Sequence, residues 1–285
     1  MRLLVQQAMW SMEGLGENGR EWSLEEKLER ISAAGYGGVY DNMPEPEREK
    51  EYFRLLDRYS LSFATQAFPG RRGDISELAA RAKHAGALYM NAQVMDSFVV
   101  GDDALRLLDG LMEEAAVSSL PFFVETHRGR ITQDLLRTVE YVNALPSLRL
   151  TIDLSHYVLS GEMQEPGAEA EQAFAKLLER TSCIHGRISN SQQIQVPWEK
   201  DGVTKLPITN HFVRWWTTGM KHRLQDLQPG EVFPFVTELG PPPYAITVEN
   251  ATGVYTEPLN RWEASLIMKK LAEECWEKAT GEEKK

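Results

Sequence analysis

The chain has 285 residues, of which 42% are hydrophobic and 26% are charged, a composition typical of a globular enzyme with a large core. Its net charge of −11, from 31 basic and 42 acidic residues, argues against a protein that grips nucleic-acid backbone, because such binding needs an excess of Lys and Arg. It contains no apolar run of about 18 residues, so we expect no membrane-spanning helix.

Short apolar segments alternate along the chain with longer amphipathic ones, a pattern typical of parallel strands covered by helices. The predicted strands span residues 3–9, 37–40, 61–67, 88–94, 122–125, 148–153, 182–187 and 235–239. The predicted helices span residues 23–34, 45–59, 75–85, 103–118, 132–145, 168–179, 210–224 and 260–279. The first helix opens with Ser23 and Glu26 at capping-box spacing and ends before Gly35, a favourable C-terminal cap.

Eight strand-then-helix units predict a single-domain α/β fold, a (β/α)8 TIM barrel over residues 1–285, with residues 281–285 frayed. The main competitor is a doubly wound open sheet that binds a nucleotide. Its glycine-rich signature is absent, because Gly14, Gly16 and Gly19 come before a polar run rather than between a strand and a helix. We therefore predict the closed barrel.

Four successive predicted strands end in groups that can bind a metal or transfer a proton, namely Glu125, Asp153, His185 and Glu238. In TIM barrels the reactive groups lie at the C-terminal ends of the strands. Neighbouring strands are about 4.8 Å apart, so inward side chains from four adjacent ends can meet at one point. A single acidic residue at a strand end is more often a helix cap or a solvated loop residue. The same placement on four successive strands favours a shared site.

Three carboxylates at one point would repel one another in a low-dielectric cavity, and a divalent cation removes that repulsion. Three oxygen ligands and one imidazole suit Mn²⁺, Co²⁺, Zn²⁺ or Mg²⁺ and do not choose among them. We therefore predict one divalent metal ion and take manganese as the working choice.

The motifs around these strand ends resemble those of a known superfamily. They read Phe122-Phe-Val-Glu-Thr-His, Thr151-Ile-Asp-Leu-Ser-His-Tyr, Ile184-His-Gly-Arg-Ile and Thr237-Glu-Leu-Gly-Pro-Pro-Pro-Tyr. They resemble the xylose isomerase-like barrels, and within them the sugar phosphate isomerase/epimerase group that includes the ketose 3-epimerases. The resemblance implies that Glu125, Asp153, His185 and Glu238 bind one metal. It also implies that His156, in the Asp-x-x-His pair, touches a substrate hydroxyl and that Arg187 reaches the substrate.

The sequence departs from the ketose epimerases between His185 and Glu238. The segment after His185 reads Gly-Arg-Ile-Ser-Asn-Ser-Gln-Gln, without the family's acidic-and-arginine pattern, and 53 positions separate the two residues. Both departures lie in the segment that determines substrate specificity. The resemblance therefore implies the metal site in this chain, but it does not imply which sugar the chain binds.

Further polar and aromatic residues near the strand ends are candidates for binding substrate, although each could equally be a loop or packing residue. With His156 and Arg187, the candidates are His127, Arg128, Gln66, Gln93, Trp10 and Trp198. Trp198 belongs to a long connection, residues 189–210, of the kind that covers an active site. No glycine-rich phosphate cradle follows the last two strands, which favours a substrate without phosphate.

These residues predict a metal-dependent sugar isomerase or epimerase that works by proton transfer through an enediolate next to a carbonyl. Glu125 and Glu238 come from strands that are not adjacent and could flank the reacting carbon as the two catalytic bases. A lyase or hydratase acting on a 3-keto sugar or glycoside would share the first step, so the sequence does not separate the two.

Two other classes compete with this interpretation. An abasic-site endonuclease of the same superfamily would need three metals and a basic surface, which the net charge of −11 opposes. A non-catalytic sugar-binding barrel predicts that one of the four ligands would be missing, and none is. The expected partner is a small carbohydrate, without nucleic acid or membrane, and homo-oligomerisation stays open.

Localisation is predicted from the N-terminal segment and the cysteines. Residues 1–10 lack the pattern of a cleavable signal peptide, and Cys183 and Cys275 are too few for a disulfide framework. We therefore expect a cytoplasmic protein.

Overall fold

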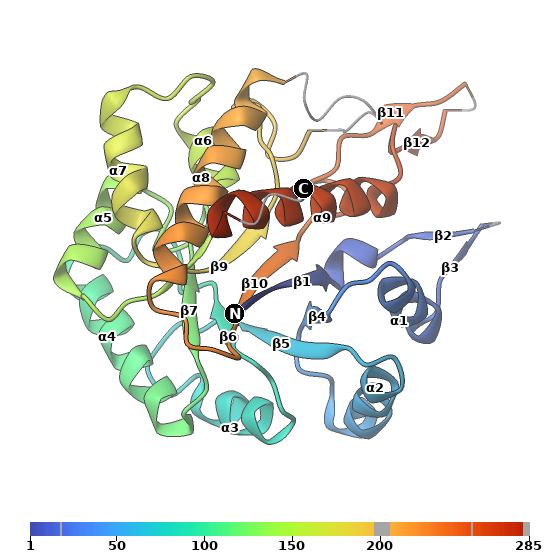
Figure 1. The fold of residues 1–285 in the computed structure, drawn as a ribbon, viewed down its shortest axis with the longest axis horizontal. Coiled ribbons are helices and arrows are strands. Elements are labelled where there is room, and N and C mark those ends of the chain that lie inside the picture. The colour runs from blue at the N-terminus through green and yellow to red at the C-terminus, as the bar shows by residue number, and fades with distance from the viewer. Residues whose placement is uncertain (18, 197–205, 252, 282–285) are drawn as a thin grey trace.

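The computed structural model describes residues 1–17, 19–196, 206–251 and 253–281. The eight predicted strands form a closed parallel barrel in the order β1-β10-β9-β8-β7-β6-β5-β4, so the predicted (β/α)8 TIM barrel is confirmed (Figure 1). The strands are β1 (Arg2–Ala8), β4 (Gly38–Asp41), β5 (Ser62–Ala67), β6 (Met90–Ala92), β7 (Phe122–Glu125), β8 (Leu150–Ile152), β9 (Thr181–Gly186) and β10 (Val232–Thr237).

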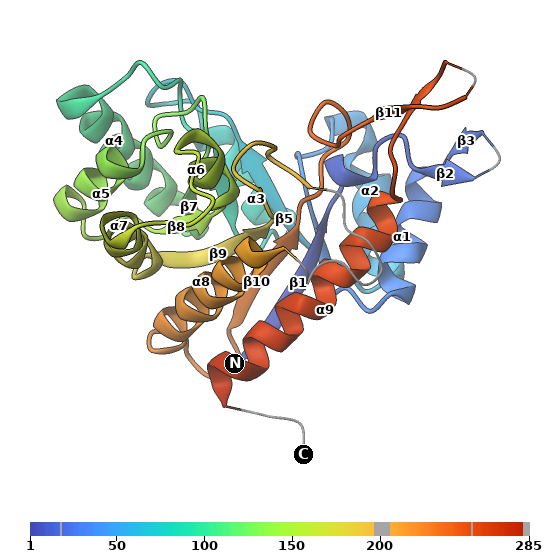
Figure 2. The same cartoon turned by 90° about the horizontal axis from the view of Figure 1, so that it is seen from above.

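The predicted helices also form and lie around the outside of the barrel (Figures 1 and 2). They are α1 (Leu24–Ala33), α2 (Pro46–Arg58), α3 (Ser76–His84), α4 (Gly101–Ser118), α5 (Leu135–Ala144), α7 (Ala168–Leu178), α8 (Pro207–Leu224) and α9 (Arg261–Thr280). Within the described residues, no helix combines the length and apolar character that crossing a membrane requires. Of the end predicted to be frayed, Gly281 caps α9 and residues 282–285 lie outside the described residues.

Some short elements were not predicted. A 3-10 helix, η1 (Trp10–Met12), follows β1, and a six-residue helix, α6 (Ser155–Ser160), follows β8. Two hairpins, β2 (Gly16–Glu17) with β3 (Arg20–Glu21) and β11 (Val248–Glu249) with β12 (Tyr255–Thr256), follow β1 and β10 and project from the same side of the molecule (Figures 1 and 2). Because they follow strands, they stand at the C-terminal face of the barrel, where these folds place their active sites.

The start of α1 shows how the local sequence sets an element boundary. The Ser23 hydroxyl accepts a hydrogen bond from the Glu26 main-chain N–H at 3.3 Å, and the Glu26 carboxylate accepts one from the Ser23 N–H at 2.7 Å. This is the predicted capping box, which satisfies N–H groups that the first turn leaves free. Gly35, just after the helix, has a φ of +74°, a left-handed conformation that glycine adopts without strain.

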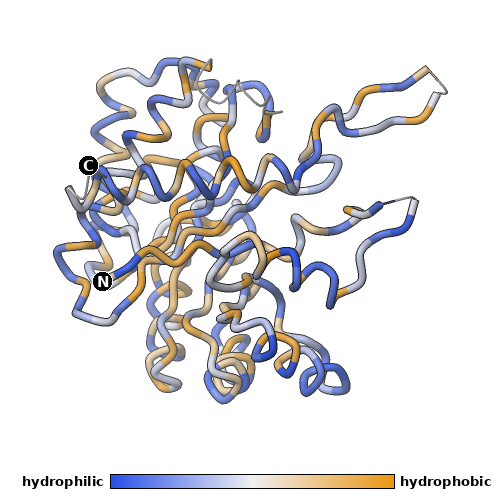
Figure 3. The backbone as a smooth tube through the Cα atoms, turned by 45° about the vertical axis from the view of Figure 1, so that its right-hand side comes forward, coloured by the Kyte–Doolittle hydropathy of each residue, from blue (hydrophilic) through white to orange (hydrophobic). Residues whose placement is uncertain are grey.

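Two apolar layers make up the core, one between the strands and helices and one inside the barrel. Figure 3 shows the central strands as mainly hydrophobic. The inner layer contains Ala8, Tyr40, Ala64, Tyr89, Phe123, Cys183 and Val236. Because side chains alternate along a strand, residues two positions further along point into the same interior, toward the C-terminal mouth. The inner layer therefore lies directly beneath the polar groups at the mouth of the barrel.

Gly38 allows β4 and β5 to approach each other. A Cβ at this position would lie 2.5 Å from the Ser62 main-chain oxygen and 2.2 Å from its hydroxyl. We predict that Gly38→Ala lowers the free energy of unfolding by about 1–3 kcal/mol, measured by urea denaturation, because the strands must separate to fit the methyl group. Gly70→Ala is the matched control, since its Cβ would meet no atom closer than 3.5 Å. Equal stability of the two variants would contradict this account.

Candidate functional site

Four adjacent strands, β7 to β10, bring the predicted metal-binding residues to the mouth of the barrel. Glu125 ends β7, His185 lies in β9, and Asp153 and Glu238 follow β8 and β10. Side-chain ligand atoms of Glu125, His185 and Glu238 all lie within 4.8 Å of one another, and all three residues are buried. Each stands two residues beyond an interior residue of the same strand, as Glu125 follows Phe123, so strand alternation directs them inward.

Thr126 fixes the ends of β7 and β8 relative to each other. Its hydroxyl donates to the Asp153 carbonyl at 3.0 Å and accepts from the Asp153 main-chain N–H at 2.8 Å. On the following loop, the Thr132 hydroxyl donates to the Glu125 carbonyl at 2.6 Å. Two threonine hydroxyls thus hold the main chain at Glu125 and Asp153, from which the two carboxylates project.

Glu125 is fully buried and held by two amides of β6 and the residue after it. Asn91 Nδ2 donates to Glu125 Oε2 at 2.6 Å and also to the Tyr40 hydroxyl at 2.7 Å, while Gln93 Nε2 lies 3.3 Å from both carboxylate oxygens. Burial alone would raise the pKa of Glu125, but the charge of His185 and the hydrogen bonds outweigh it and lower the pKa to about 2. Glu125 is therefore a carboxylate at neutral pH.

Glu238 and Arg187 form a buried ion pair next to this carboxylate. Arg187 Nη2 lies 2.5 Å from Glu238 Oε2, and Arg187 Nε donates to the Glu238 main-chain carbonyl at 2.9 Å. The same Nη2 lies 3.7 Å from Asp153 Oδ2. Arg187 therefore contacts the site from within it, rather than forming a salt bridge at the barrel rim.

Asp153 lies beside the group formed by Glu125, His185 and Glu238 and is not part of it. Its Oδ1 accepts from the Ser155 N–H at 2.9 Å and from the Ser155 hydroxyl, whereas its Oδ2 has no hydrogen-bond partner in the described part of the chain. Burial raises the pKa of Asp153 to about 6, although Arg187 acts in the opposite direction. A buried carboxylate oxygen without a partner is a group that a bound cation would satisfy.

His185 completes the group. Its Nδ1 lies 3.2 Å from Glu238 Oε2 and 3.6 Å from Glu125 Oε2. Burial lowers the pKa of His185, but the two glutamates outweigh burial and raise it well above its ordinary value. Neither ring nitrogen has a well-formed hydrogen bond to any described residue. Two carboxylates and an imidazole that converge, with a third carboxylate beside them, fit a divalent metal ion and do not identify which one.

His127 and His156 lie against each other beside Glu125. Their ring centroids are 3.9 Å apart, and His127 Nδ1 lies 2.5 Å from the Arg128 carbonyl, so this nitrogen carries the proton. His156 is fully buried, and its Nε2 lies 3.5 Å from Asp153 Oδ2. Burial lowers the pKa of both histidines, that of His156 well below its ordinary value. Both are therefore neutral imidazoles at pH 7.

The aromatic side of the mouth is built around Tyr244, which was not among the predicted site residues. Trp10 meets the Tyr244 ring edge-on at 5.0 Å, and the guanidinium carbons of Arg128 and Arg187 each lie 4.8 Å from its centroid. Gly240 leaves room for the Trp10 indole to pack against the main chain, because a Cβ at position 240 would lie 2.2 Å from that ring. Tyr244 ends the quoted motif after Glu238, and that position was the available signal in the sequence.

A cavity of about 720 Å³ opens at the C-terminal ends of β1, β4 and β5. Trp10 and Gln66 line it, whereas Glu125, Asp153, His185 and Glu238 do not. Trp10 also lies 5.9 Å from the Arg187 guanidinium carbon, so this indole stands between the cavity and the carboxylate group. Gln66 faces Tyr40 at 3.4 Å and does not contact the carboxylates. Trp198, the remaining candidate, lies outside the described residues.

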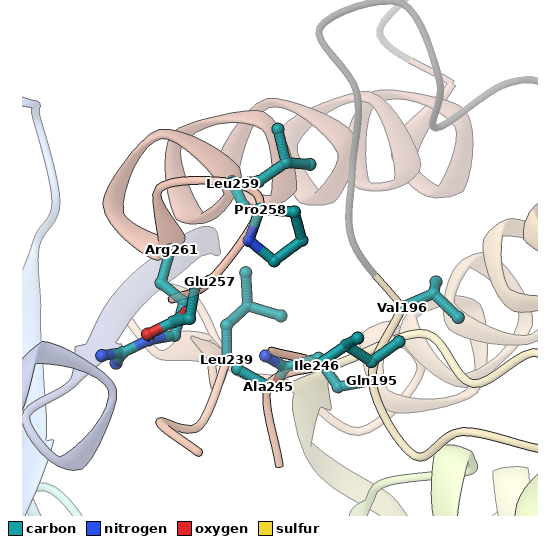
Figure 4. A pocket seen from close by; sticks show the side chains of 10 residues that line it. Gln195, Val196, Leu239, Ala245, Ile246, Glu257, Pro258, Leu259 and Arg261 are labelled. Carbon is teal, nitrogen blue, oxygen red and sulfur yellow. Dashed lines mark hydrogen bonds and ion pairs between the residues drawn. The ribbon is translucent and has the colours of Figure 1, made fainter. Parts of the chain in front are cut away.

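A second, smaller pocket of about 30 Å³ lies beside the start of α9 (Figure 4). Its polar groups already have partners. Gln195 exchanges two hydrogen bonds with the Gly240 main chain, and Glu257 pairs with Arg261 at 2.7 Å. We assign no site to it.

Comparison with known proteins identifies the fold. No protein-family model and no curated protein matches this chain. A xylose isomerase-like TIM barrel protein from Mycobacterium smegmatis, in complex with magnesium, matches with a TM-score of 0.61 at 12% identity, over 97% of this chain and 98% of its own. A D-tagatose 3-epimerase-like protein matches with a TM-score of 0.61 at 12% identity, over 98% of this chain and 99% of its own.

A probable 3-DHS dehydratase from Bacillus anthracis matches with a TM-score of 0.56 at 13% identity, over 83% of this chain and 92% of its own. Sequence identities this low show a shared fold and no more. The chain therefore has the fold of the xylose isomerase-like TIM barrels, as its motifs predicted.

The amide of Asn91 orients Glu125, so it should support metal binding indirectly. We predict that Asn91→Leu weakens Mn²⁺ binding at least about tenfold in isothermal titration calorimetry, because loss of a group that orients a ligand typically costs 10- to 100-fold. Asn143→Leu, an exposed residue in the last turn of α5 at the opposite end of the barrel, is the control for replacing a surface Asn and should bind Mn²⁺ as the wild type does. Unchanged affinity in a folded Asn91→Leu variant would show that Asn91 does not support the site.

Proposed function

We propose that this protein is a divalent-metal-dependent sugar isomerase or epimerase that moves a proton at a carbon next to a carbonyl. The observation that carries the proposal is the buried group of Glu125, His185 and Glu238 at the barrel mouth, with Asp153 beside it. The similar structures support it, because one is described with magnesium and another as D-tagatose 3-epimerase-like.

The four predicted ligands would hold the cation, and it would polarise the substrate carbonyl as a Lewis acid and balance the carboxylate charges. Mn²⁺, Co²⁺, Zn²⁺ and Mg²⁺ all suit this set of oxygen and nitrogen donors. His185 would bind the ion as a neutral imidazole. Glu125 and Glu238 raise its pKa and so stabilise its protonated form, which means that metal binding would release this proton.

Glu125 and Glu238 are the proposed catalytic bases. They stand on β7 and β10 with β8 and β9 between them, so they can face a substrate carbon from two sides. One carboxylate removes the proton and the other returns it, which inverts the carbon. Return of the proton to the neighbouring carbon interconverts an aldose and a ketose.

The surrounding residues would hold the sugar. His156 and Arg187 can hydrogen-bond hydroxyl groups, and Trp10 offers a flat apolar face of the kind on which sugar rings stack. The cavity of about 720 Å³ that Trp10 lines is in the range of sites for small molecules. A small carbohydrate is therefore the proposed substrate.

A dehydratase is the second candidate, and the similarity to the probable 3-DHS dehydratase favours it. Its first step is the same proton removal, after which the neighbouring hydroxyl would leave as water. Product mass separates the two reactions, because isomerisation conserves the mass of the substrate and dehydration lowers it by one water.

We predict that the Mn²⁺-loaded protein in D₂O exchanges a proton next to the carbonyl in at least one member of a panel of ketoses, keto-glycosides and inosose ketones, observed by proton NMR. Glu238→Gln should slow this exchange by about 10²–10⁴-fold, because it removes a general base. Metal content, measured in parallel, should stay close to one ion per chain.

Glu231→Gln is the matched control, since Glu231 is exposed and precedes the opposite end of the same strand, β10. It should exchange as the wild type does. If Glu238→Gln retained the full exchange rate, Glu238 would not be a base. If no compound exchanged with the loaded wild type, the proposed reaction would be wrong.

A further inference from the structure

Positively charged and hydrogen-bond-donating side chains gather on one side of the proposed metal site. Arg128 follows β7, Arg187 follows β9 and Tyr244 follows β10, and both guanidinium groups pack against the Tyr244 ring. The His127 and His156 rings lie 3.9 Å apart next to them. The segments after β7, β8 and β9 thus bring four nitrogen-bearing side chains to one place, beside the Tyr244 ring from the segment after β10.

Several of these nitrogens are buried without a partner. Four nitrogens make no hydrogen bond to any described residue: Nη1 of Arg128, Nη1 of Arg187 and both ring nitrogens of His156. Arg187 is 1% exposed and His156 is fully buried, so solvent does not satisfy them. In the described ranges of the chain, the one hydrogen-bond partner of His127 Nε2 is the Tyr244 hydroxyl, at 3.4 Å. Buried donors that lack an acceptor are costly, which indicates that an acceptor is supplied by a ligand.

The glutamate and aspartate already present do not fill this need. Arg187 meets Glu238 through Nε and Nη2, and Asp153 lies nearest to the same Nη2, so Nη1 is left over. Arg128 has no ion pair with any acidic side chain in the described structure, and its guanidinium lies against Tyr244.

A second cation is the alternative occupant, because ligand atoms of Glu125, His127 and His156 also lie within 4.8 Å of one another. Two observations oppose it. A guanidinium cannot ligate a metal, so a second ion would leave both arginine nitrogens unsatisfied. The charges of Arg128 and Arg187 act on His156, and they would repel a further cation there.

We propose that the substrate carries an anionic oxygen group, a carboxylate or a phosphate, which Arg128, Arg187 and His156 bind beside the metal site. Guanidinium groups suit such oxyanions because their N–H donors match the spacing of the two acceptor oxygens. The chain as a whole is acidic, with a net charge of −11, so this attraction is local. The inference rests on the proposed function, since it places the anion on the substrate of that reaction. A carboxylate would agree with the sequence-based preference for a substrate without phosphate, and a phosphate would not.

The test is calorimetric titration of the Mg²⁺-loaded protein with inorganic phosphate, acetate and erythritol. We expect phosphate or acetate to bind more tightly than neutral erythritol, and the tighter of the two identifies the anionic group. Arg128→Gln should weaken that binding at least about tenfold, because it removes a charge-assisted hydrogen bond, and Arg128→Lys should retain part of it. Arg58→Gln, which changes an exposed arginine of α2, should bind as the wild type does.

The proposal is overturned if erythritol binds as tightly as both anions, or if Arg128→Gln binds the preferred anion as the wild type does. It is also overturned if the wild type takes up two metal ions per chain and His156→Gln takes up one. Metal content of the same samples tests the proposed function separately. A wild type without bound metal contradicts that function, whereas dependence of anion binding on Arg128 still supports the anion subsite.

Discussion

The repulsion among three buried carboxylates is the constraint on which the rest of the site depends. Glu125, Asp153 and Glu238 are each at most 5% exposed, and they stand at the ends of strands whose neighbours are about 4.8 Å apart. Like charges removed from water interact strongly, so a fold that places them there must supply compensating charge. The chain does so with His185 of β9 and with Arg187 directly after it, and amides from the β6 side add hydrogen bonds.

Arg187 determines how much charge is left to balance. Three carboxylates and one guanidinium leave an excess of two negative charges, which a divalent cation matches. In its absence, a proton on His185 offsets part of the excess, consistent with the raised pKa of that imidazole. Because Arg187 also contacts Tyr244 and Trp10, it joins the carboxylate group to the aromatic side of the mouth. The proposed metal chemistry and the proposed anion subsite therefore share one side chain.

Much of the fold could be predicted because the barrel repeats one pattern that a single sequence displays clearly. Each buried strand is a short apolar run, the helices carry apolar stripes, and α1, α5 and α9 in the described part of the chain begin at a side-chain cap such as Ser23. The shorter elements lacked such signals. Helix α6 has only six residues, too few for a stripe, and the paired strands of each hairpin have two residues each.

The site was predictable where a residue ends a strand, and less so where it supports another residue. Strand ends alone predicted that Glu125, Asp153, His185 and Glu238 gather at the barrel mouth, and their role as metal ligands stays a prediction. Asn91 was missed because it lies within β6, although it stands two residues before Gln93 on the inward side of that strand. Tyr244 stood in the motif after Glu238, but its contacts with two arginines depend on where the loop folds back, which that motif does not specify. Strand alternation is the rule that would have found Asn91.

The most direct measurement is anomalous X-ray scattering at the manganese edge from crystals of the protein grown with Mn²⁺. The account predicts one strong peak bonded to Glu125, Asp153, His185 and Glu238, with Arg187 moved away from Asp153 but still against Tyr244. Absence of a peak among these four side chains, with the Arg187–Glu238 pair and a protonated His185 filling the space instead, would contradict the claim that they share a cation.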